Sequence, residues 1–456
     1  MACAAYYLCP RKMKQGKMIF NQKTAQCFLA VFLVFSSYLK AQNTKEMTID
    51  DITAMAVAHH AQLKLNAKNI DIAKQQKEVT RLKQLPDISA SATAFYLGNA
   101  LIVDKDFSNT ETMAMPHFGN TYAVEATELL YKGGLIKKSL EAADLKTQLA
   151  ELDLENNKQS IRFLVISNYL DMLKLINQKK VYENNRQLAQ QRLDQIRKFY
   201  SQGMITRNEV IRGELIIQNL DQALLTISNN KSILNYNLDQ ATGLPTDTEI
   251  IPKEQIQEPE NEENLSYFLH LAYDHHPLLK SAGTSIQMAS KNLEIINTEK
   301  KPTLAAFGGY NMQKPITNTL PVVDMYSNTW EAGISLSYNI DNLYKSKKKE
   351  ELGQLQKEQA EDALNLTKQN IEMAVNAAYL KYQEAVKNAA IQRKSQELAQ
   401  ENYKIIEAKY LNQLAVQVEM TDATQAKLEA EISYVNAEIN VLYQYYQLLK
   451  TTGTLY

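Results

Sequence analysis

Residues 56–64 read AVAHHAQLK and residues 272–280 read AYDHHPLLK, so one short pattern occurs twice, 216 positions apart. Three more pairs follow in the same order along the chain. They are LP at 85–86 with KP at 301–302, the segments that start at Tyr200 and Tyr410, and ATG at 241–243 with TTG at 451–453. Chance explains four ordered landmarks poorly. The sequence therefore predicts an internal duplication, so that both halves of the chain should have the same order of helices and strands.

Each copy predicts the same order of elements: a helix that ends at a proline, two strands around a loop, a very long helix, a tight turn and a return helix. The first helices are expected near 49–84 and 264–299, with Pro277 breaking the second one early. Residues 135–199 contain no glycine or proline, so this helix is roughly 100 Å long at 1.5 Å per residue. Gly243 and Gly453 are plausible caps of the return helices. The apolar spacing of a coiled coil is carried by Ile161, Val165, Tyr169, Met172 and Ile176.

The chain divides into four parts. Residues 1–42 are expected to be a signal peptide, because Lys23 precedes the apolar run CFLAVFLVF at 27–35 and small residues follow it. Residues 43–243 form the first repeat, residues 244–262 an acidic, irregular connector, and residues 263–456 the second repeat. All three cysteines lie in the leader, so the exported chain uses neither disulfides nor thiol chemistry.

The composition restricts the class of protein. The chain of 456 residues is 45% hydrophobic and 22% charged, with only 14 glycines and 10 prolines; this balance suits long helices. Its net charge of −1 leaves no basic field for nucleic acid. After residue 42 no uninterrupted apolar stretch reaches the roughly 20 residues that a membrane helix needs. If this chain crosses a bilayer, closed β-strands must do so.

Residues 330–340 alternate between apolar and polar side chains over eleven positions, the length of a tilted barrel strand. Residues 122–130 repeat this alternation less regularly. The alternative is an ordinary half-buried sheet, but an export signal and four strands in a helical chain favour a barrel with polar residues inside. Four strands cannot close a barrel, since the smallest have about eight, so the protein must oligomerise. The predicted lumen residues are Glu125, Thr127, Glu331 and Ser335.

Together these residues resemble the TolC family of outer-membrane efflux proteins, over residues 48–454. The motifs are HHAQLK at 59–64, LPDIS at 85–89, LLYKGG at 129–134, QATGLP at 240–245 and DATQAKLEA at 422–430. The resemblance implies a mainly α fold with a membrane β-barrel. Three subunits each supply four strands to a twelve-stranded barrel in the outer-membrane lipid, and an α-helical barrel extends into the periplasm. The homotrimer is a passive exit duct that docks on a periplasmic adaptor and an inner-membrane pump, with neither cofactor nor catalysis.

The resemblance also implies a constriction at the periplasmic mouth, lined by Glu419 and Asp422. These residues are three apart and so share a helical face, and rings of carboxylates favour cations. The alternative is that both are solvated carboxylates near a helix start, where the helix dipole favours them.

The family closes this mouth with a latch that matches Tyr410 and Glu209. A second latch uses an arginine, but that position here is Ala415, and the turn glycine of the second repeat is replaced by Gln413. The gating network therefore departs from the family pattern.

Other classes of function fit the sequence less well. The adjacent histidines at 59–60 and 275–276 chelate poorly, because neighbouring residues on a helix point about 100° apart. We find no phosphate-binding loop, nucleophile elbow or zinc signature, so we expect neither an enzyme nor a metal site. A periplasmic adaptor has a helical hairpin but also compact β-rich domains. A structural coiled-coil protein of the envelope would not need alternating strands at matching points of a duplication.

Overall fold

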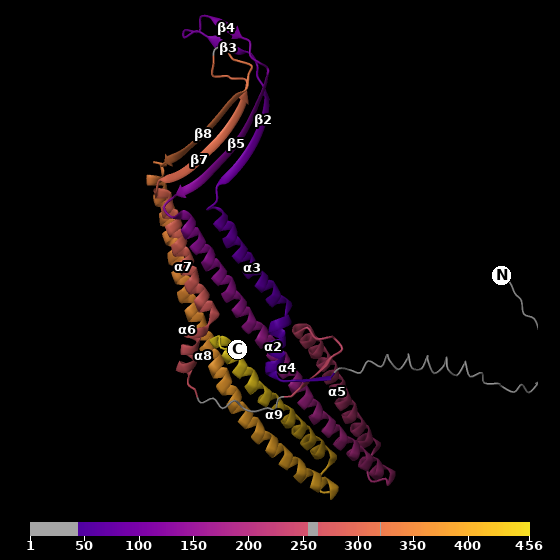
Figure 1. The fold of residues 1–456 in the computed structure, drawn as a ribbon. Helices are drawn as coiled ribbons and strands as arrows, with labels where there is room; N and C mark the ends of the chain where they lie inside the picture. Colours follow the sequence, from indigo (N-terminus) through magenta and orange to yellow (C-terminus); the bar gives the residue numbers. More distant parts are fainter. Residues whose placement is uncertain (1–43, 254–262, 320) are drawn as a thin grey trace, which may run out of the picture.

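The computed structural model describes residues 44–253, 263–319 and 321–456, so the expected signal peptide at 1–42 lies outside the described residues. The molecule is elongated, with a curved sheet at one end and two helical hairpins at the other (Figure 1). None of the helices in these ranges combines the length and apolar composition that a bilayer crossing requires.

Both repeats contain two short helices, two strands and a long hairpin, in that order. The first repeat has α2 (Ile49–His59), α3 (Ala61–Leu82), β2 (Asp87–Tyr96), β5 (Phe118–Tyr131), α4 (Leu135–Ser201) and α5 (Arg207–Thr242). The second repeat has α6 (Leu265–His275), α7 (Pro277–Asn297), the 3₁₀ helix η1 (Thr298–Lys300), β7 (Thr303–Lys314), β8 (Ser327–Ser337), α8 (Asn342–Leu411) and α9 (Gln417–Thr452). The two return helices end at Gly243 and Gly453, which have φ of 74° and 75°.

The expected single helix over 49–84 is wrong, because the chain breaks at His60. His60 has φ −60° and ψ 129°, and its Nδ1 accepts a hydrogen bond from the Gln62 backbone N–H at 3.2 Å. In the second repeat His276 caps α7 in the same way, just before Pro277. The second histidine of each pair is therefore a helix cap. The break at Pro277 was predictable, whereas its counterpart has no proline to mark it.

The expected irregular connector over 244–262 is also wrong in its first part. Residues Glu249–Pro252 form β6, which pairs in parallel with β1 (Thr44–Met47). The Tyr169 hydroxyl fixes this pair, since it donates to the Met47 carbonyl at 2.9 Å and accepts from the Lys253 N–H at 3.2 Å. Residues 254–262 lie outside the described ranges.

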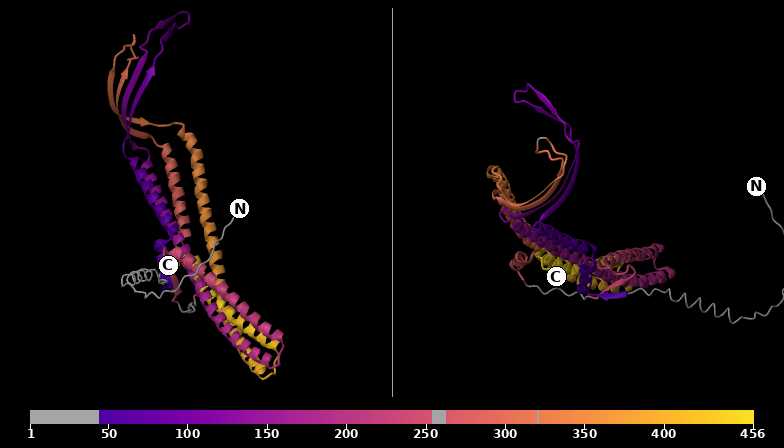
Figure 2. Two further views of the ribbon diagram at one scale, coloured as in Figure 1. Left: turned by 90° about the vertical axis from the view of Figure 1, so that its right-hand side faces the viewer. Right: turned by 45° about the horizontal axis from the view of Figure 1, so that its top comes forward.

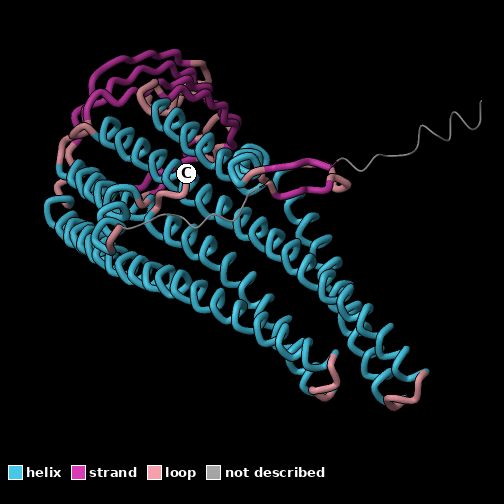
Figure 3. The backbone as a smooth tube through the Cα atoms, turned by 90° about the horizontal axis from the view of Figure 1, so that it is seen from below, coloured by secondary structure: helices cyan, strands magenta, loops and turns pink. Residues whose placement is uncertain are grey.

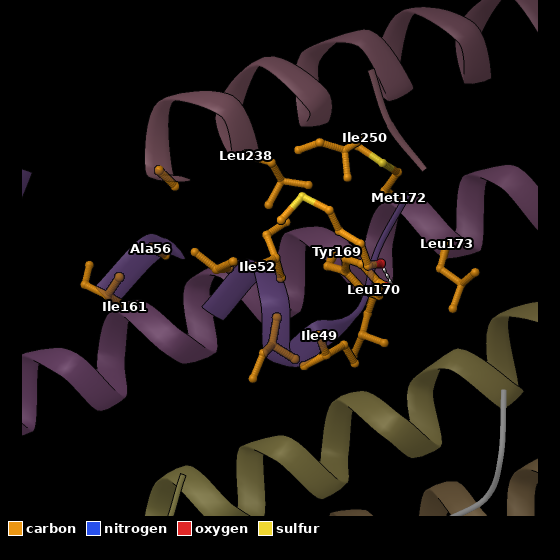
Figure 4. Packing of buried hydrophobic residues seen from close by; sticks show 14 of the residues in the cluster. Ile49, Ile52, Ala56, Ile161, Tyr169, Leu170, Met172, Leu173, Leu238 and Ile250 are labelled. Carbon is orange, nitrogen blue, oxygen red and sulfur yellow. Dashed lines mark hydrogen bonds between the residues drawn. The ribbon is translucent and has the colours of Figure 1, made fainter. Parts of the chain in front are cut away.

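The main core lies beside this strand pair (Figure 4). Side chains from α2, α4, α5 and β6 meet there, and Ile52, Tyr169, Leu238 and Ile250 have no exposed surface. Full burial of one such large side chain stabilises the folded protein by about 1.5–3 kcal/mol. This core attaches the small parallel strand pair to the side of the long helices.

The sheet has the strand order β2-β5-β7-β8, and every neighbouring pair is antiparallel. The central pairing of β5 with β7 joins the two repeats. The loop between β2 and β5 carries its own hairpin, β3 (Ala100–Val103) with β4 (Thr110–Met113). Within the described ranges, β2 and β8 each pair on one side only.

Helices α4 and α8 run from the sheet to the far end of the molecule and change neighbours on the way (Figure 2). Near the sheet the order of packed helices is α3-α4-α7-α8; near the far end it is α5-α4-α9-α8. In both halves α8 lies at one edge of the layer, and α3 or α5 lies at the other.

We predict that Gly453→Ala lowers the thermal unfolding midpoint more than Gly134→Ala does. Both glycines have positive φ, 75° and 77°, so alanine costs about 1–2 kcal/mol at either position. A Cβ at Gly453 would also lie 2.7 Å from the His276 Cα, whereas a Cβ at Gly134 meets nothing within 4 Å. Circular dichroism of the two variants measures the difference. Equal midpoints would mean that the close approach to His276 is not rigid.

Candidate functional site

The two hairpins turn at the same end of the molecule, at residues 202–206 and 412–416 (Figure 3). Each turn needs one residue in the left-handed region. Gly203 supplies it in the first hairpin with φ 74°, and Gln413 supplies it in the second with φ 60°. The replacement of glycine by Gln413 therefore keeps the turn, at the conformational cost of a side chain in that region.

Glu419 and Asp422, the predicted constriction residues, lie in the first two turns of α9 and are exposed. The Oε2 atom of Glu419 accepts a hydrogen bond from the Val416 backbone N–H at 3.0 Å. This is one half of a capping box, in which a carboxylate satisfies a free N–H group of the helix start. Asp422 makes no such contact and is the freer of the two carboxylates.

Tyr410 and Glu209, the predicted latch, line one pocket of about 410 Å³ between the two hairpin ends. No hydrogen bond joins the two side chains, and the Oε2 atom of Glu209 is buried without a partner. Burial raises the pKa of Tyr410, and the nearby Glu209 carboxylate raises it further, while Arg192 opposes them. The structure thus brings the two residues together but leaves the latch bond unmade.

A polar network that sequence reasoning missed joins the two hairpins above this pocket. Arg192 on α4 donates to the Thr424 hydroxyl at 2.7 Å and to the Tyr403 hydroxyl at 2.9 Å. It also pairs with Glu407 at 3.4 Å, and its side chain is only 14% exposed. Tyr403 in turn donates to Glu407 at 2.7 Å, and burial is the main cause that raises its pKa. One arginine of the first repeat therefore holds both helices of the second hairpin.

The network continues along the same seam towards the middle of the molecule. Asn185 donates to Glu431 at 2.8 Å, and Glu431 pairs with the buried Lys427 at 3.5 Å. The Lys427 ammonium lies 4.8 Å from the centre of the Tyr403 ring. Asn185 and Arg192 are seven residues apart, so polar side chains at a heptad spacing in a long apolar seam were the available signal.

The four predicted lumen residues lie on one face of the sheet. Glu125 and Glu331 are both paired with Gly309, Thr127 pairs with Phe307, and Ser335 with Ala305. Directly opposite residues share a face, and alternate residues along a strand do too. Gly309 leaves a hollow of about 380 Å³ between the two glutamates. This polar face therefore carries two carboxylates at one level.

The opposite face of the sheet is apolar and open to its surroundings. Trp330 is 80% exposed, Ile334 69% and Leu336 72% on β8, and Ile88 is 71% exposed on β2. Soluble monomers rarely expose a contiguous apolar surface of this kind. An apolar outer face opposite a polar one is the pattern of strands that meet lipid on one side and water on the other.

Residues 268–454 match the family model of the outer membrane efflux protein. The structure is similar to the outer-membrane channel OprN, with 11% identity, 89% of each chain covered and a TM-score of 0.72. It is similar to the CmeC outer membrane channel of Campylobacter jejuni (14% identity, 90% of this chain and 86% of that one, TM-score 0.71). It is also similar to the outer membrane protein VceC of Vibrio cholerae, with 14% identity, 89% of this chain and 96% of that one covered, and a TM-score of 0.70. No curated protein sequence matches the chain significantly.

The resemblance to TolC-like efflux proteins and the expected fold class are thereby confirmed. The protein is located in the outer membrane, and its long helices form the periplasmic part. Its family transports molecules through a channel and is not a family of enzymes. Within the described ranges no group of three or more His, Cys, Asp or Glu residues is arranged to hold a metal ion.

We predict that Arg192→Met destabilises the efflux protein by about 2–4 kcal/mol, because it removes three hydrogen bonds and leaves Glu407 partly buried without its cation. Arg197→Met is the matched control. Arg197 is 50% exposed and pairs with Glu214 within a single hairpin, and such exposed pairs contribute about 0–1 kcal/mol. Thermal unfolding of both variants in detergent measures the difference. A loss no larger than that of the control would show that the network does not hold the hairpins together.

Proposed function

We propose that three copies of this efflux protein form a passive exit duct across the outer membrane and the periplasm. The observation that carries this proposal is a pair of exposed apolar stripes at the two edges of the helical layer. On α8 the stripe follows a seven-residue spacing, except that Gln359 interrupts it between Leu352 and Leu366 and one step of eleven separates Leu380 from Ile391. Its exposed members are Leu352, Leu366, Met373, Leu380, Ile391, Leu398 and Ile405.

The other edge carries a matching pattern. Leu65, Ile72 and Val79 on α3 are exposed at a spacing of seven, and α5 exposes Ile211, Leu215, Leu225, Ile233 and Tyr236. In our proposal α8 of one subunit packs against α3 of the next near the sheet and against α5 near the hairpin ends. The step of eleven lies where the partner helix changes. A contact between two different edges closes into a ring when the rotation from one subunit to the next is a whole fraction of a turn.

The size of the barrel that the sheet can form favours three copies. Two copies would supply eight strands, and a barrel of that size is filled by its own side chains. Three copies supply twelve strands, which leave room for a water-filled lumen lined by the polar face. The apolar face then meets lipid, and the unpaired edges of β2 and β8 pair between subunits. A soluble adaptor or a structural coiled coil has no use for such a sheet.

The hairpin ends are the proposed docking surface for the periplasmic adaptor, and through it for the inner-membrane pump. Met204, Leu414, Val416 and Val418 at these ends are each at least half exposed. Apolar side chains clustered at the free end of a long helical rod are suited to contact another protein. The pump supplies the energy, so the duct itself needs neither catalysis nor a cofactor.

The assembly is tested by the mass of the detergent-extracted protein. We expect a trimer by light scattering, and we expect Met373→Glu on the α8 stripe to abolish it, because three buried carboxylates would lie in an apolar seam. Thr112→Glu adds the same charge to the exposed β3–β4 hairpin and should leave the trimer intact. A monodisperse wild-type monomer that retains its strand content would refute the ring.

The proposed constriction is tested by ion selectivity. In planar bilayers, Glu419→Gln/Asp422→Asn should lower the preference for cations and weaken block by multivalent cations. Asp422→Asn alone should have most of this effect, because one oxygen of Glu419 is already held by Val416. Screening confines the effect to charges within about 10 Å at 0.1 M salt, so Glu111→Gln at the opposite end of the molecule should change little. Unaltered selectivity in the double variant would mean that these residues are only helix-start carboxylates.

A further inference from the structure

A groove of about 770 Å³ crosses three neighbouring helices, α4, α9 and α8. A volume of this size lies in the range of about 300–1,000 Å³ that small-molecule sites have. Carboxamide side chains from all three helices line it. They are Gln178 on α4, Asn436 and Asn440 on α9, and Asn388 and Gln392 on α8. The groove is therefore large enough for a ligand, and its walls are polar.

The groove lies on the face of the helical layer opposite to α2, α6 and the β1–β6 pair. Tyr169 on α4 lies in the core that α2 and β6 share. Gln178 follows Tyr169 by nine residues, so the step of about 100° per residue places it on the opposite side of α4. On α9, Tyr445 packs against the core that includes α6, and Asn436 precedes it by nine residues. Both helices therefore place the groove on the face that these elements do not cover.

This face is also the one that carries the proposed constriction. Asn440 follows Asp422 by 18 residues on the unbroken helix α9, which is about five full turns. The two side chains therefore share one side of α9, roughly 27 Å apart along its axis. In the proposed duct the groove then lines the passage, between the constriction and the sheet.

The lining of the groove has no net charge. Its charged residues are Asp171 and Lys174, both on α4. They are three residues apart and pair with each other at 2.5 Å. Because the two charges cancel, an ion of either sign finds no net countercharge in the groove. The preferred ligand is therefore neutral.

The carboxamides are accessible and have donors and acceptors to spare. Asn388 and Asn436 are exposed, and Gln392 is half-buried. Gln178 donates to the Oδ1 atom of Asn436 at 2.6 Å. Within the described ranges neither Asn388 nor Gln392 has a hydrogen-bond partner. Each carboxamide carries two N–H donors and one accepting oxygen, so the groove matches a ligand that offers donors and acceptors side by side.

A sugar has this combination of properties. Its hydroxyl groups lie on adjacent carbons, and each hydroxyl both donates and accepts. The C–H face of the ring can pack on Tyr443, a half-buried aromatic side chain of the lining that Phe163 supports at 5.4 Å. An extended peptide fits less well, because it binds through main-chain hydrogen bonds to a strand edge. The groove is built from helices, whose backbone groups are bonded internally.

We propose that this groove binds a neutral oligosaccharide, which passes through the proposed duct as cargo. Neighbouring packed helices lie about 8–10 Å apart, so a ligand needs more than one ring to contact all three helices. The binding step stands by itself, whereas the role as cargo rests on the proposed function.

The binding test is calorimetric titration of the full chain in an amine-oxide detergent, whose head group contains no sugar. The probes are three neutral trisaccharides: maltotriose, cellotriose and triacetylchitotriose. We expect at least one of them to bind, and its permethylated form, which lacks hydroxyl donors, to bind at least about tenfold more weakly. Asn388→Ala/Gln392→Ala should weaken binding of the same trisaccharide by about tenfold, because two carboxamides are lost.

The matched control is Asn365→Ala/Gln369→Ala. It removes the same two residue types at the same spacing from exposed positions of α8, roughly 35 Å nearer the sheet, and should leave binding unchanged. Both double variants should keep the wild-type thermal unfolding midpoint. Binding of none of the three trisaccharides, or full affinity in Asn388→Ala/Gln392→Ala, would overturn the proposal and leave the groove as a solvated helix face.

The role as cargo is measured with single channels in a planar bilayer. The trisaccharide that binds, added on the side of the hairpin ends, should cause blockades of the current, and Asn388→Ala/Gln392→Ala should shorten them. Binding without blockades would place the groove outside the passage and refute the role as cargo. A chain that binds the trisaccharide but never assembles into a trimer would refute the proposed duct and leave the site in place.

Discussion

The unpaired edges of the four-stranded sheet are the constraint on which the rest of the structure depends. Within the described residues β2 and β8 each pair on one side only, and the outward face between them is apolar. Open edges cannot persist in hydrocarbon, where no water satisfies their N–H and C=O groups. In the proposed duct, neighbouring subunits supply the missing pairs. The helical layer meets the same requirement, since its two edges expose apolar stripes that a single chain cannot bury.

Two unbroken helices, α4 and α8, connect the sheet to the hairpin turns at the other end of the molecule. α4 and α8 start at the sheet and end at the hairpin turns, and each exchanges its neighbours on the way. The apolar contacts between the helices hold them together but do not by themselves fix how far one helix is shifted along another. The network of Arg192, Tyr403, Glu407 and Thr424 adds directional bonds near the mouth. Such a network stabilises one relative position of the hairpins, and breaking one member leaves buried charge behind.

Much of the fold could be predicted because the duplication repeats each local signal. The absence of glycine and proline over 135–199 predicts α4, and glycines 243 and 453 mark the ends of the return helices. The break at His60 could not be predicted in this way, because a histidine that caps a helix looks like any other helical residue until its ring meets a free N–H. Strand β6 was missed as well. Its residues lie in a polar segment, and it pairs with β1, which is about 200 residues away in the sequence.

The sequence by itself determined the long helices, the strands of the main sheet and their order, the polar and apolar faces of those strands, and the candidate residues at the hairpin ends. These features follow from local spacing and from residue types that act within one or two turns. Only the tertiary structure decided what those residues contact. Glu209 and Glu419 occupy equivalent positions in the two repeats, yet one carboxylate caps its helix and the other lies in a pocket with an unpaired oxygen. Local position does not decide between the two outcomes, because both glutamates stand at the third position of their helices.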